Sequence, residues 1–283
     1  MLRTQTGTSN FTFQNSEFFA PGRTAAQVAL RKNGLSDAGA EVEKRITGTV
    51  NIVLSSLPPA VFRSLAPAMK RVSLAKEEFL FQPDDEPDFI YFPETAAVSE
   101  FQILEDGRMV EVAIIGREGA VGLSKLFCSS RIPNCVQVSQ AGNAVRINLS
   151  EARKTIRQKP EVAFYFYPFI DAYIRQISQK TVCNLYHSVR ARFCTWLLMV
   201  QDRCENSVLQ LTHEQIARTL GVYRPRITCI ARELKKKNVI SYSRGGISIC
   251  DRSQIEDSAC DCYQEIRDFA DVVSLPDAGA TLH

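Results

Sequence analysis

The amino-acid sequence predicts an α+β fold: a small antiparallel β-structure, then a series of helices, then a winged helix-turn-helix. Three observations support this prediction. Between about 50 and 150, short runs of β-branched and aromatic residues alternate with turn signals. From 150 to 200 the apolar residues recur at helical spacing. Residues 208–250 then contain two short helical segments followed by a hairpin pattern.

The composition indicates a globular protein of about two domains. The chain has 283 residues, of which 45% are hydrophobic and 23% are charged. It has neither an apolar stretch of about 18 residues nor a secretory signal, so we expect no membrane partner and a cytoplasmic location. In that compartment the nine cysteines are expected to be free thiols rather than a disulfide framework.

The two ends of the chain are expected to lack fixed structure. Residues 1–45 are rich in Thr, Ser, Gln, Gly and Ala without a sustained period, which is typical of a disordered arm. A short helix near 25–32 would interrupt this arm. Residues 271–283 are expected to form a flexible tail.

The segment from 46 to 158 is expected to form the β-structure. Two prolines begin a short helix over 57–65. Glu105-Asp106-Gly107 is a hairpin signal between two of the predicted strands. Short strands at nearly even spacing favour a small sandwich or barrel. The predicted strands span 79–81, 89–92, 98–104, 109–115, 135–138 and 144–149.

Helices are predicted from 150 to 200. Ser150 is expected to cap the first helix, and Pro160 begins a long segment that Pro168 would kink or restart. A further helix over 192–199 contains Trp196, the only tryptophan. One narrow face of the long segment suits a seam between two helices, although an ordinary buried helix would show the same period. That face consists of Ile170, Ile174, Ile177 and Thr181.

The segment 208–250 contains the most specific local signals. Thr212 and Gln215 form a capping-box pattern, and Gly221 ends that helix at a position that requires a left-handed backbone. After a short turn, Arg224 begins a second helix, which tolerates Pro225 in its first turn. Two helices joined by a short glycine-containing turn and followed by a hairpin predict a winged helix-turn-helix.

Charge is concentrated around this motif. Residues 211–244 contain eight Lys or Arg and two Glu, whereas residues 251–283 contain eight acidic residues and two Arg. The basic block indicates a polyanion as the partner. The alternative is a solvated helix face without a partner.

The second helix is the expected DNA-reading element, because a helix fits the major groove and Arg matches the O6 and N7 acceptors of guanine. Arg224, at the start of this helix, is the first candidate for a base contact. Lys235, Lys236 and Lys237 lie further along and are expected to face phosphate or solvent. The candidate DNA-binding residues are Thr212, Tyr223, Arg224, Arg226, Thr228, Arg232 and Arg244.

The segment LTHEQIARTLGVYRPRITCIARELKKKNVISYSRGGISICDRSQIE resembles the C-terminal winged helix of the Crp/Fnr transcription regulators. IYFPETAAVS, VEVAIIGREGAVGL and WLLMVQDR are similar to segments of one bacterial branch of that family. The resemblance implies a β-roll (double-stranded β-helix) of the cyclic-nucleotide-binding type at 46–158, a dimerisation helix at 159–190 and a DNA-binding domain at 191–270. It also implies a homodimer on double-stranded promoter DNA, a sensor domain of unknown effector, and RNA polymerase as a further partner.

Two departures from the family pattern bear on DNA specificity. Pro225 stands where better-known members carry Glu, and Cys229 stands where they carry a second Arg. The DNA target of those members therefore cannot be carried over. The departures also leave open an alternative function, an effector-binding or protein-interaction module with a degenerate DNA-binding domain.

The cofactors of better-known members are not expected here. Ile132 and Pro133 follow Arg131, where cyclic-nucleotide binders carry small residues, and this argues against a cyclic nucleotide. No cysteine precedes Cys128, so an iron–sulfur cluster held by N-terminal cysteines is not expected either. The candidate cofactor-binding residues are Arg117, Glu118, Arg131 and Ser178.

We also expect no metal site and no enzymatic activity. His213-Glu214 resembles the start of a zinc-protease motif, but position 217 is Ala instead of His. Cys260 and Cys262 are two residues apart and lack a second pair near them in the sequence. No set of nucleophile, base and orienting residue is recognisable from the sequence.

Overall fold

The computed structural model describes residues 48–128, 131–204, 206–243 and 245–273. The predicted arm with its short helix lies outside these residues. Of the predicted tail, 271–283, the first two residues belong to the last helix, Cys262–Val272, and residues 274–283 lie outside the described part. Within the described ranges, no helix is both long and apolar enough to cross a membrane.

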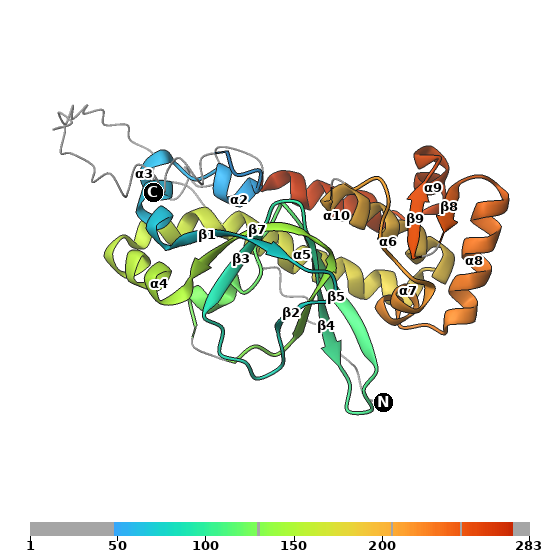
Figure 1. Ribbon diagram of the computed structural model, residues 1–283, viewed down its shortest axis with the longest axis horizontal. Helices are drawn as coiled ribbons and strands as arrows, with labels where there is room; N and C mark the ends of the chain where they lie inside the picture. The colour runs from blue at the N-terminus through green and yellow to red at the C-terminus, as the bar shows by residue number, and fades with distance from the viewer. Residues whose placement is uncertain (1–47, 129–130, 205, 244, 274–283) are drawn as a thin grey trace, which may run out of the picture. The chain divides into compact units, whose positions relative to one another are not determined.

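The predicted β-structure consists of two antiparallel sheets (Figure 1). The first has the strand order β1 (Met69–Leu74), β7 (Gly142–Asn148) and β3 (Phe89–Pro93). The second has the order β2 (Phe79–Phe81), β6 (Cys135–Gln140), β4 (Ala97–Ile103) and β5 (Met109–Ile115). Leu74 and Ala144 of the first sheet share one buried cluster with Val98 and Val138 of the second. The two sheets therefore pack around a common core, as a β-roll does.

β1 is absent from the predicted strands because its sequence, MKRVSL, places Lys70 beside Arg71 and breaks the apolar–polar alternation. It lies at the edge of its sheet, next to β7, where charged side chains can reach solvent. The other strands agree with the predictions to within about two residues. The predicted hairpin joins β4 to β5, with Gly107 at φ 81°.

Short helices accompany the β-roll. They are α2 (Ile52–Ser55), α3 (Pro59–Leu65), η1 (Ala66–Ala68), η2 (Leu123–Leu126) and α4 (Leu149–Gln158). Asn148, instead of the predicted Ser150, caps α4. The Oδ1 of Asn148 accepts hydrogen bonds from the backbone N–H groups of Ser150 (3.1 Å) and Glu151 (3.2 Å). Strand β7 ends at Asn148 in the extended conformation that an N-cap requires.

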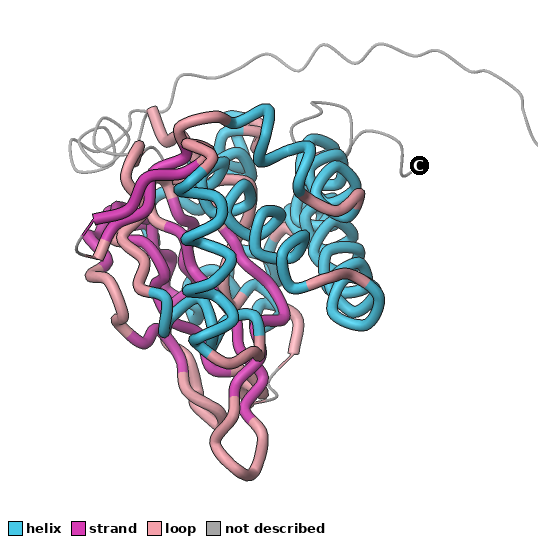
Figure 2. Tube along the Cα trace, turned by 90° about the vertical axis from the view of Figure 1, so that its right-hand side faces the viewer, coloured by secondary structure: helices cyan, strands magenta, loops and turns pink. Residues whose placement is uncertain are grey.

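The long helical segment has two parts, η3 (Pro160–Phe166) and α5 (Tyr167–Tyr186). Pro168 lies in the first turn of α5, so it begins this helix instead of kinking it. The next helix, α6 (Val189–Arg203), is longer than the predicted 192–199. In Figure 2 most of the helices lie to one side of the strands.

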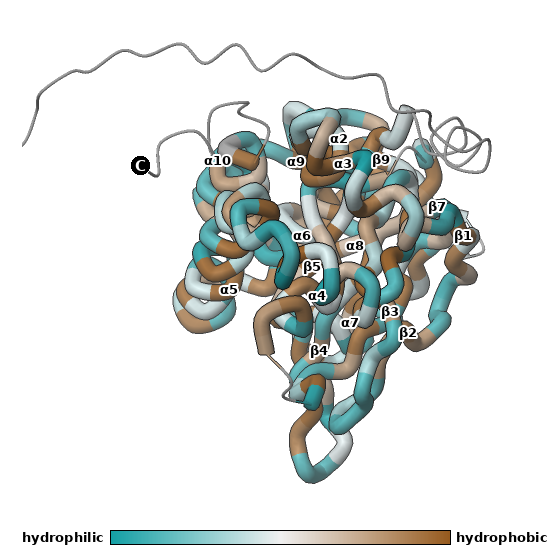
Figure 3. The backbone as a smooth tube through the Cα atoms, turned by 90° about the vertical axis from the view of Figure 1, so that its left-hand side faces the viewer, coloured by the Kyte–Doolittle hydropathy of each residue, from teal (hydrophilic) through white to brown (hydrophobic). Residues whose placement is uncertain are grey.

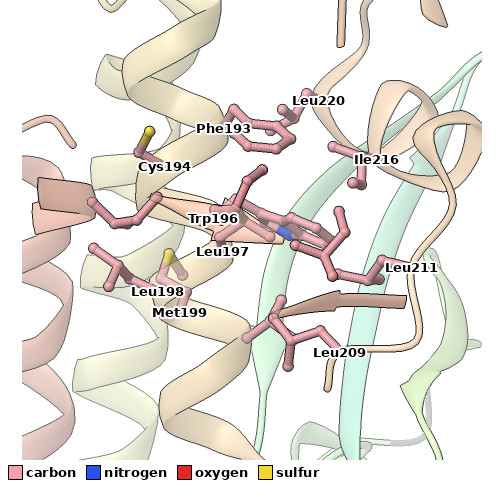
Figure 4. Close-up of a cluster of buried hydrophobic side chains, with 14 of the residues drawn as sticks. Phe193, Cys194, Trp196, Leu197, Leu198, Met199, Leu209, Leu211, Ile216 and Leu220 are labelled. Carbon is pink, nitrogen blue, oxygen red and sulfur yellow. The ribbon is translucent and has the colours of Figure 1, made fainter. Parts of the chain in front are cut away.

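The C-terminal part contains α7 (His213–Leu220), α8 (Arg224–Lys236), β8 (Ile240–Ser243), β9 (Gly246–Ile249), α9 (Arg252–Ser258) and α10 (Cys262–Val272). One apolar cluster holds α6 against α7 and α8. Figure 4 shows Phe193 of α6 pointing toward Ile216 and Leu220 of α7. Each such side chain contributes about 1.5–3 kcal/mol when it is fully buried. This core fixes the position of the helix-turn-helix relative to α6.

Candidate nucleic-acid interface

α7 and α8 form the predicted helix-turn-helix. Thr212 Oγ1 accepts a hydrogen bond from the N–H of Gln215 (3.1 Å), and Gln215 Oε1 accepts one from the N–H of Thr212 (2.8 Å). The predicted capping box is thereby confirmed. Gly221 ends α7 at φ 64°, a conformation that is easiest for glycine. A cap of this kind is worth about 1 kcal/mol, and here it determines where the turn into α8 begins.

α8 presents a basic outer face. Its inner face is buried and consists of Ile227, Ile230, Ala231 and Leu234. The candidates Arg224, Arg226 and Arg232 are exposed, and Tyr223, at the N-cap, is 88% exposed. Arg224 Nε lies 4.0 Å from Glu214 Oε2, and both side chains are well exposed. Such a pair is weak, so the guanidinium remains available for a base or a phosphate.

Thr228 is connected through His213 to the hairpin β8–β9, which is the wing of the domain. It is half-buried, and its Oγ1 is 3.1 Å from Nδ1 of His213. The His213 ring packs edge-on against Tyr242 of β8, with ring centroids 5.2 Å apart. Burial, assisted by the charge of Arg224, lowers the pKa of His213, which favours the neutral imidazole at neutral pH. The remaining candidate, Arg244, lies outside the described residues.

Lys235 holds the wing against α8. Its Nζ lies 4.3 Å from the centre of the Tyr242 ring and donates a hydrogen bond to the Tyr242 carbonyl (3.3 Å). A groove of about 370 Å³ runs between the N-terminal turns of α7 and α8 and the wing. Thr212, Arg224 and Ser243 are among the residues that line it. The fold therefore brings Thr212 and Arg224, which are separate in the sequence, to one surface.

A second cavity, of about 460 Å³, lies between the β-roll and α5. Its wall is largely apolar and includes Phe169, Ile170 and Ile174 of α5. The four candidate cofactor-binding residues are all described, and none of them lines this cavity. These four are Arg117, Glu118, Arg131 and Ser178.

The fold does not gather these four candidates at one site. Arg117, Arg131 and Ser178 are exposed. Glu118 instead forms an ion pair with Arg203, at the end of α6, with 2.7 Å between Oε1 and Nε. The turn after β5 thus directs this carboxylate toward α6 and away from the cavity.

Glu100 of β4 is one of the polar side chains in the wall of this cavity. Tyr173 Oη of α5 donates a hydrogen bond to Glu100, and Asn134 Nδ2 donates another to its Oε2 (3.4 Å). Burial raises the pKa of Glu100, although these two hydrogen bonds oppose the shift. The same cavity wall contains the buried side chain of Lys125, whose Nζ donates a hydrogen bond to the carbonyl of Arg131 (2.8 Å). Sequence reasoning missed Glu100, and the available signal was an acidic residue in the middle of a predicted strand.

A buried ion pair joins the β-roll to α5 and α6. Glu111 of β5 is fully buried and accepts hydrogen bonds from Lys180 Nζ of α5 (3.0 Å) and from Trp196 Nε1 of α6 (3.0 Å). Ser99 Oγ of β4 donates a further hydrogen bond to this carboxylate (2.6 Å). A buried carboxylate requires such partners, because an unpaired charge in the interior is costly. The contact therefore links the cavity-bearing domain to the helix that packs against the helix-turn-helix.

Comparison with known proteins supports the resemblance seen in the sequence. Residues 71–159 match the family model of the cyclic nucleotide-binding domain, and residues 191–258 match that of the Crp-like helix-turn-helix domain. The Anaerobic regulatory protein of Bacillus subtilis is 21% identical over 181 residues, which cover 61% of this chain and 76% of that protein.

Solved structures show the same fold. FixK2 from Bradyrhizobium japonicum is 16% identical, with a TM-score of 0.57, over 68% of this chain and 98% of its own. A CRP/FNR-family transcriptional regulator from Thermus thermophilus is 18% identical, with a TM-score of 0.56, over 67% of this chain and 98% of its own. The two domain matches, in this order and with an exposed basic face on the helix-turn-helix, show that the chain belongs to the Crp/Fnr family of DNA-binding transcription regulators.

Proposed function

We propose that the protein binds a two-fold symmetric promoter site as a homodimer and reads each half-site with the N-terminal turn of α8. The observation that carries this proposal is the exposure of Tyr223, Arg224 and Arg226 at the start of a helix whose opposite face is buried. Such a helix end can enter a major groove without unpacking its domain. Arg224 is the proposed base-reading residue, and Arg226 and Thr212 are proposed to contact phosphate or a neighbouring base.

The proposed dimer forms along α5. Ile174 is 57% exposed and Leu185 is 72% exposed, with Thr181 and Val182 exposed between them. Figure 3 shows apolar segments recurring along this helix. A ridge of this kind suits pairing with the same ridge of a second copy, because helices pair along apolar stripes of this spacing.

The cavity between the β-roll and α5 is the proposed effector site. Its largely apolar wall favours a ligand with an apolar part over a cyclic nucleotide. The wall also contains one buried acidic side chain, Glu100, and one buried basic side chain, Lys125. Because Ile170 and Ile174 of α5 line the cavity, a bound ligand would contact the proposed dimer helix. This contact offers a direct route from effector binding to the spacing of the two α8 helices.

Selection of sheared genomic DNA by the purified protein at near-physiological salt, followed by sequencing, tests the proposal. We expect a two-fold symmetric motif with half-sites about one helical turn apart. Arg224→Ala should weaken binding to this motif by about 1–3 kcal/mol and relax the preference at one base pair.

The matched control is Arg157→Ala, which removes an exposed charge from α4. It should change neither the affinity nor the motif. An equal loss on all DNA sequences with Arg224→Ala would contradict the base-reading role. A flat selection profile for the wild-type protein, with and without added cell extract, would contradict the whole proposal.

A further inference from the structure

Four side chains that suit a transition metal converge at the C-terminal end of α5. Cys183 and His187 lie one helical turn apart there, whereas Cys260 and Cys262 lie between α9 and the start of α10. The three Sγ atoms and a ring nitrogen of His187 all lie within 4.8 Å of one another. Cys183 and Cys260 are 77 residues apart in the sequence. The fold therefore brings a second pair of ligating residues, Cys183 and His187, next to Cys260 and Cys262.

The distances fit one tetrahedral ion. Cys183 Sγ is 3.5 Å from Cys260 Sγ, and Cys262 Sγ is 3.3 Å from Nδ1 of His187. Ligand atoms of one zinc ion lie about 3.5–3.8 Å apart, because Zn–S bonds are about 2.3 Å and Zn–N bonds about 2.0–2.1 Å. An iron–sulfur cluster distributes its cysteines over several irons and so separates them more widely. A disulfide between Cys183 and Cys260 would leave Cys262 and His187 without a role.

The surroundings suit thiolate ligands. Cys183 and Cys262 are buried, at 4% and 0% exposure. Gln179 Nε2 donates a hydrogen bond to Cys262 Sγ (3.1 Å), and Thr195 Oγ1 lies 3.1 Å from Cys260 Sγ. Hydrogen bonds of this kind orient the ligands of a metal and adjust their basicity.

A cation, Arg192 of α6, also lies near two of the thiols, those of Cys183 and Cys260. Arg192 Nε is buried and has no hydrogen-bond partner within the described part of the chain. The Nη2 of Arg192 donates hydrogen bonds to the carbonyl of Leu220 (2.6 Å) and to Oδ1 of Asn184 (2.8 Å). Three thiolates around a divalent ion carry one net negative charge, which this guanidinium would balance.

The cluster lies outside both segments that match the family models. Those segments are residues 71–159 and 191–258. Cys183 and His187 precede the second segment, and Cys260 and Cys262 follow it. The cluster is therefore a feature of this chain that neither family model describes. It connects the C-terminal ends of α5 and α9 with α10, which packs along α5.

We propose that Cys183, His187, Cys260 and Cys262 bind one zinc ion, which ties α10 to the end of α5. Three sulfur ligands and one imidazole favour zinc over magnesium or calcium, which prefer oxygen. Because side chains fill all four positions, the ion has no open coordination site, and its role is structural.

The test measures metal on the full-length wild-type protein, purified under reducing conditions. We expect one zinc ion per chain by elemental mass spectrometry. After replacement of zinc by Co²⁺, we expect the intense visible bands and the thiolate charge-transfer band of a tetrahedral site. Removal of the ion by a chelator should lower the melting temperature, and added Zn²⁺ should restore it, because the ion binds only the folded cluster.

Variants then assign the ligands. Cys262→Ser and His187→Gln should each weaken Co²⁺ binding by more than about 100-fold, which exceeds the usual effect of changing a residue around the ligands. The matched control is Cys204→Ser, which alters a buried thiol outside the cluster, at the end of α6. It should bind Co²⁺ like the wild type. Circular dichroism verifies the fold of each variant, and the wild-type measurement decides the matter where a variant does not fold.

Three results would overturn the proposal. One is the absence of stoichiometric zinc or cobalt binding by the wild-type protein after reconstitution. Another is wild-type Co²⁺ affinity in a folded Cys262→Ser variant. The third is bound iron with acid-labile sulfide, which would replace the single ion by a cluster. DNA selection is measured separately, so failure of the zinc proposal leaves the proposed DNA-binding function intact.

Discussion

The two faces of α5 reverse the usual arrangement of a surface helix. From Tyr173 onward, the face that packs against the protein carries polar and ligating side chains at spacings of three and four residues: Tyr173, Gln176, Lys180, Cys183 and His187. The face turned away carries exposed apolar side chains, among them Val182 and Leu185. A monomeric surface helix normally places its apolar stripe on the core. The reversal indicates that polar contacts fix the position of α5, and it leaves the apolar face exposed for the proposed dimer contact.

The polar face itself contacts two different kinds of carboxylate. Lys180 pairs with Glu111, so that buried carboxylate faces a cation. Tyr173 donates a hydrogen bond to Glu100, which accepts another from the neutral amide of Asn134. One buried glutamate, Glu111, therefore forms an ion pair with α5. The other, Glu100, has a pKa that burial raises.

The largest effect is expected from Lys180→Met. Glu111 would lose its cationic partner in the protein interior, which should lower the free energy of unfolding by about 3–5 kcal/mol. Urea denaturation at neutral pH measures this loss. Combining Lys180→Met with Glu111→Gln should restore much of it, because the uncompensated charge is then removed.

The matched control for Lys180→Met is Arg175→Met, which removes an exposed charge from the same helix. It should change the free energy of unfolding by less than about 0.5 kcal/mol. Similar losses for Lys180→Met and Arg175→Met would show that burial of the ion pair does not matter.

Ile174→Glu should have a smaller effect, and on association instead of folding. It places a charge in the proposed dimer contact and should weaken the dimer by about 2–3 kcal/mol, roughly 30- to 150-fold in dissociation constant. Sedimentation over a range of protein concentrations measures this change. Val50→Glu alters an apolar residue that is 48% exposed outside α5, and it should leave the dimer intact. A dimer unaffected by Ile174→Glu would place the interface elsewhere.

The smallest effect is expected from Glu100→Gln, and it depends on pH. Burial raises the pKa of Glu100 above 4.5, its ordinary value. The folded protein therefore holds this proton more tightly than the unfolded chain does. The stability that results is present below the ordinary pKa and is lost as pH rises through the raised pKa.

Urea denaturation over a series of pH values tests this expectation. Glu100→Gln should be about as stable as the wild type in acid and more stable at higher pH, because amide burial carries no charge penalty. Parallel pH profiles for the two proteins would contradict a raised pKa at Glu100.

Local signals made the helix-turn-helix predictable from the sequence. Thr212, Gln215 and Gly221 act within one or two helical turns, so their pattern determines the ends of α7 without help from the rest of the chain. The strands were predictable for the same reason, apart from β1. The proposed DNA contacts remain predictions, because the exposure of Arg224 shows that it can reach a ligand without showing which ligand it meets.

Long-range contacts were not predictable. Glu111 is 69 residues from Lys180 and 85 from Trp196. A local sequence pattern cannot predict partners that are so far apart. The same holds for Cys183 and Cys260, whose proximity depends on how α10 packs along α5. Glu118 shows that a predicted ligand residue can have another role. The family resemblance made it a candidate cofactor-binding residue, but in the structure it forms an ion pair with Arg203.

The polar contacts of α5 all lie on one face of the helix. The helix has 20 residues, which span about 30 Å, and its contacts run from the cavity beside the β-roll to the cluster of Cys183, His187, Cys260 and Cys262. A rotation of the helix about its axis would break all of these contacts together, because they share one face. Orientations of α5 between two fully bonded arrangements would therefore lack these contacts, so the helix is suited to switching between a few discrete orientations. The amide hydrogens of α5 should exchange with solvent as one cooperative unit. A displacement of one end of the helix should therefore move the other end by a similar amount.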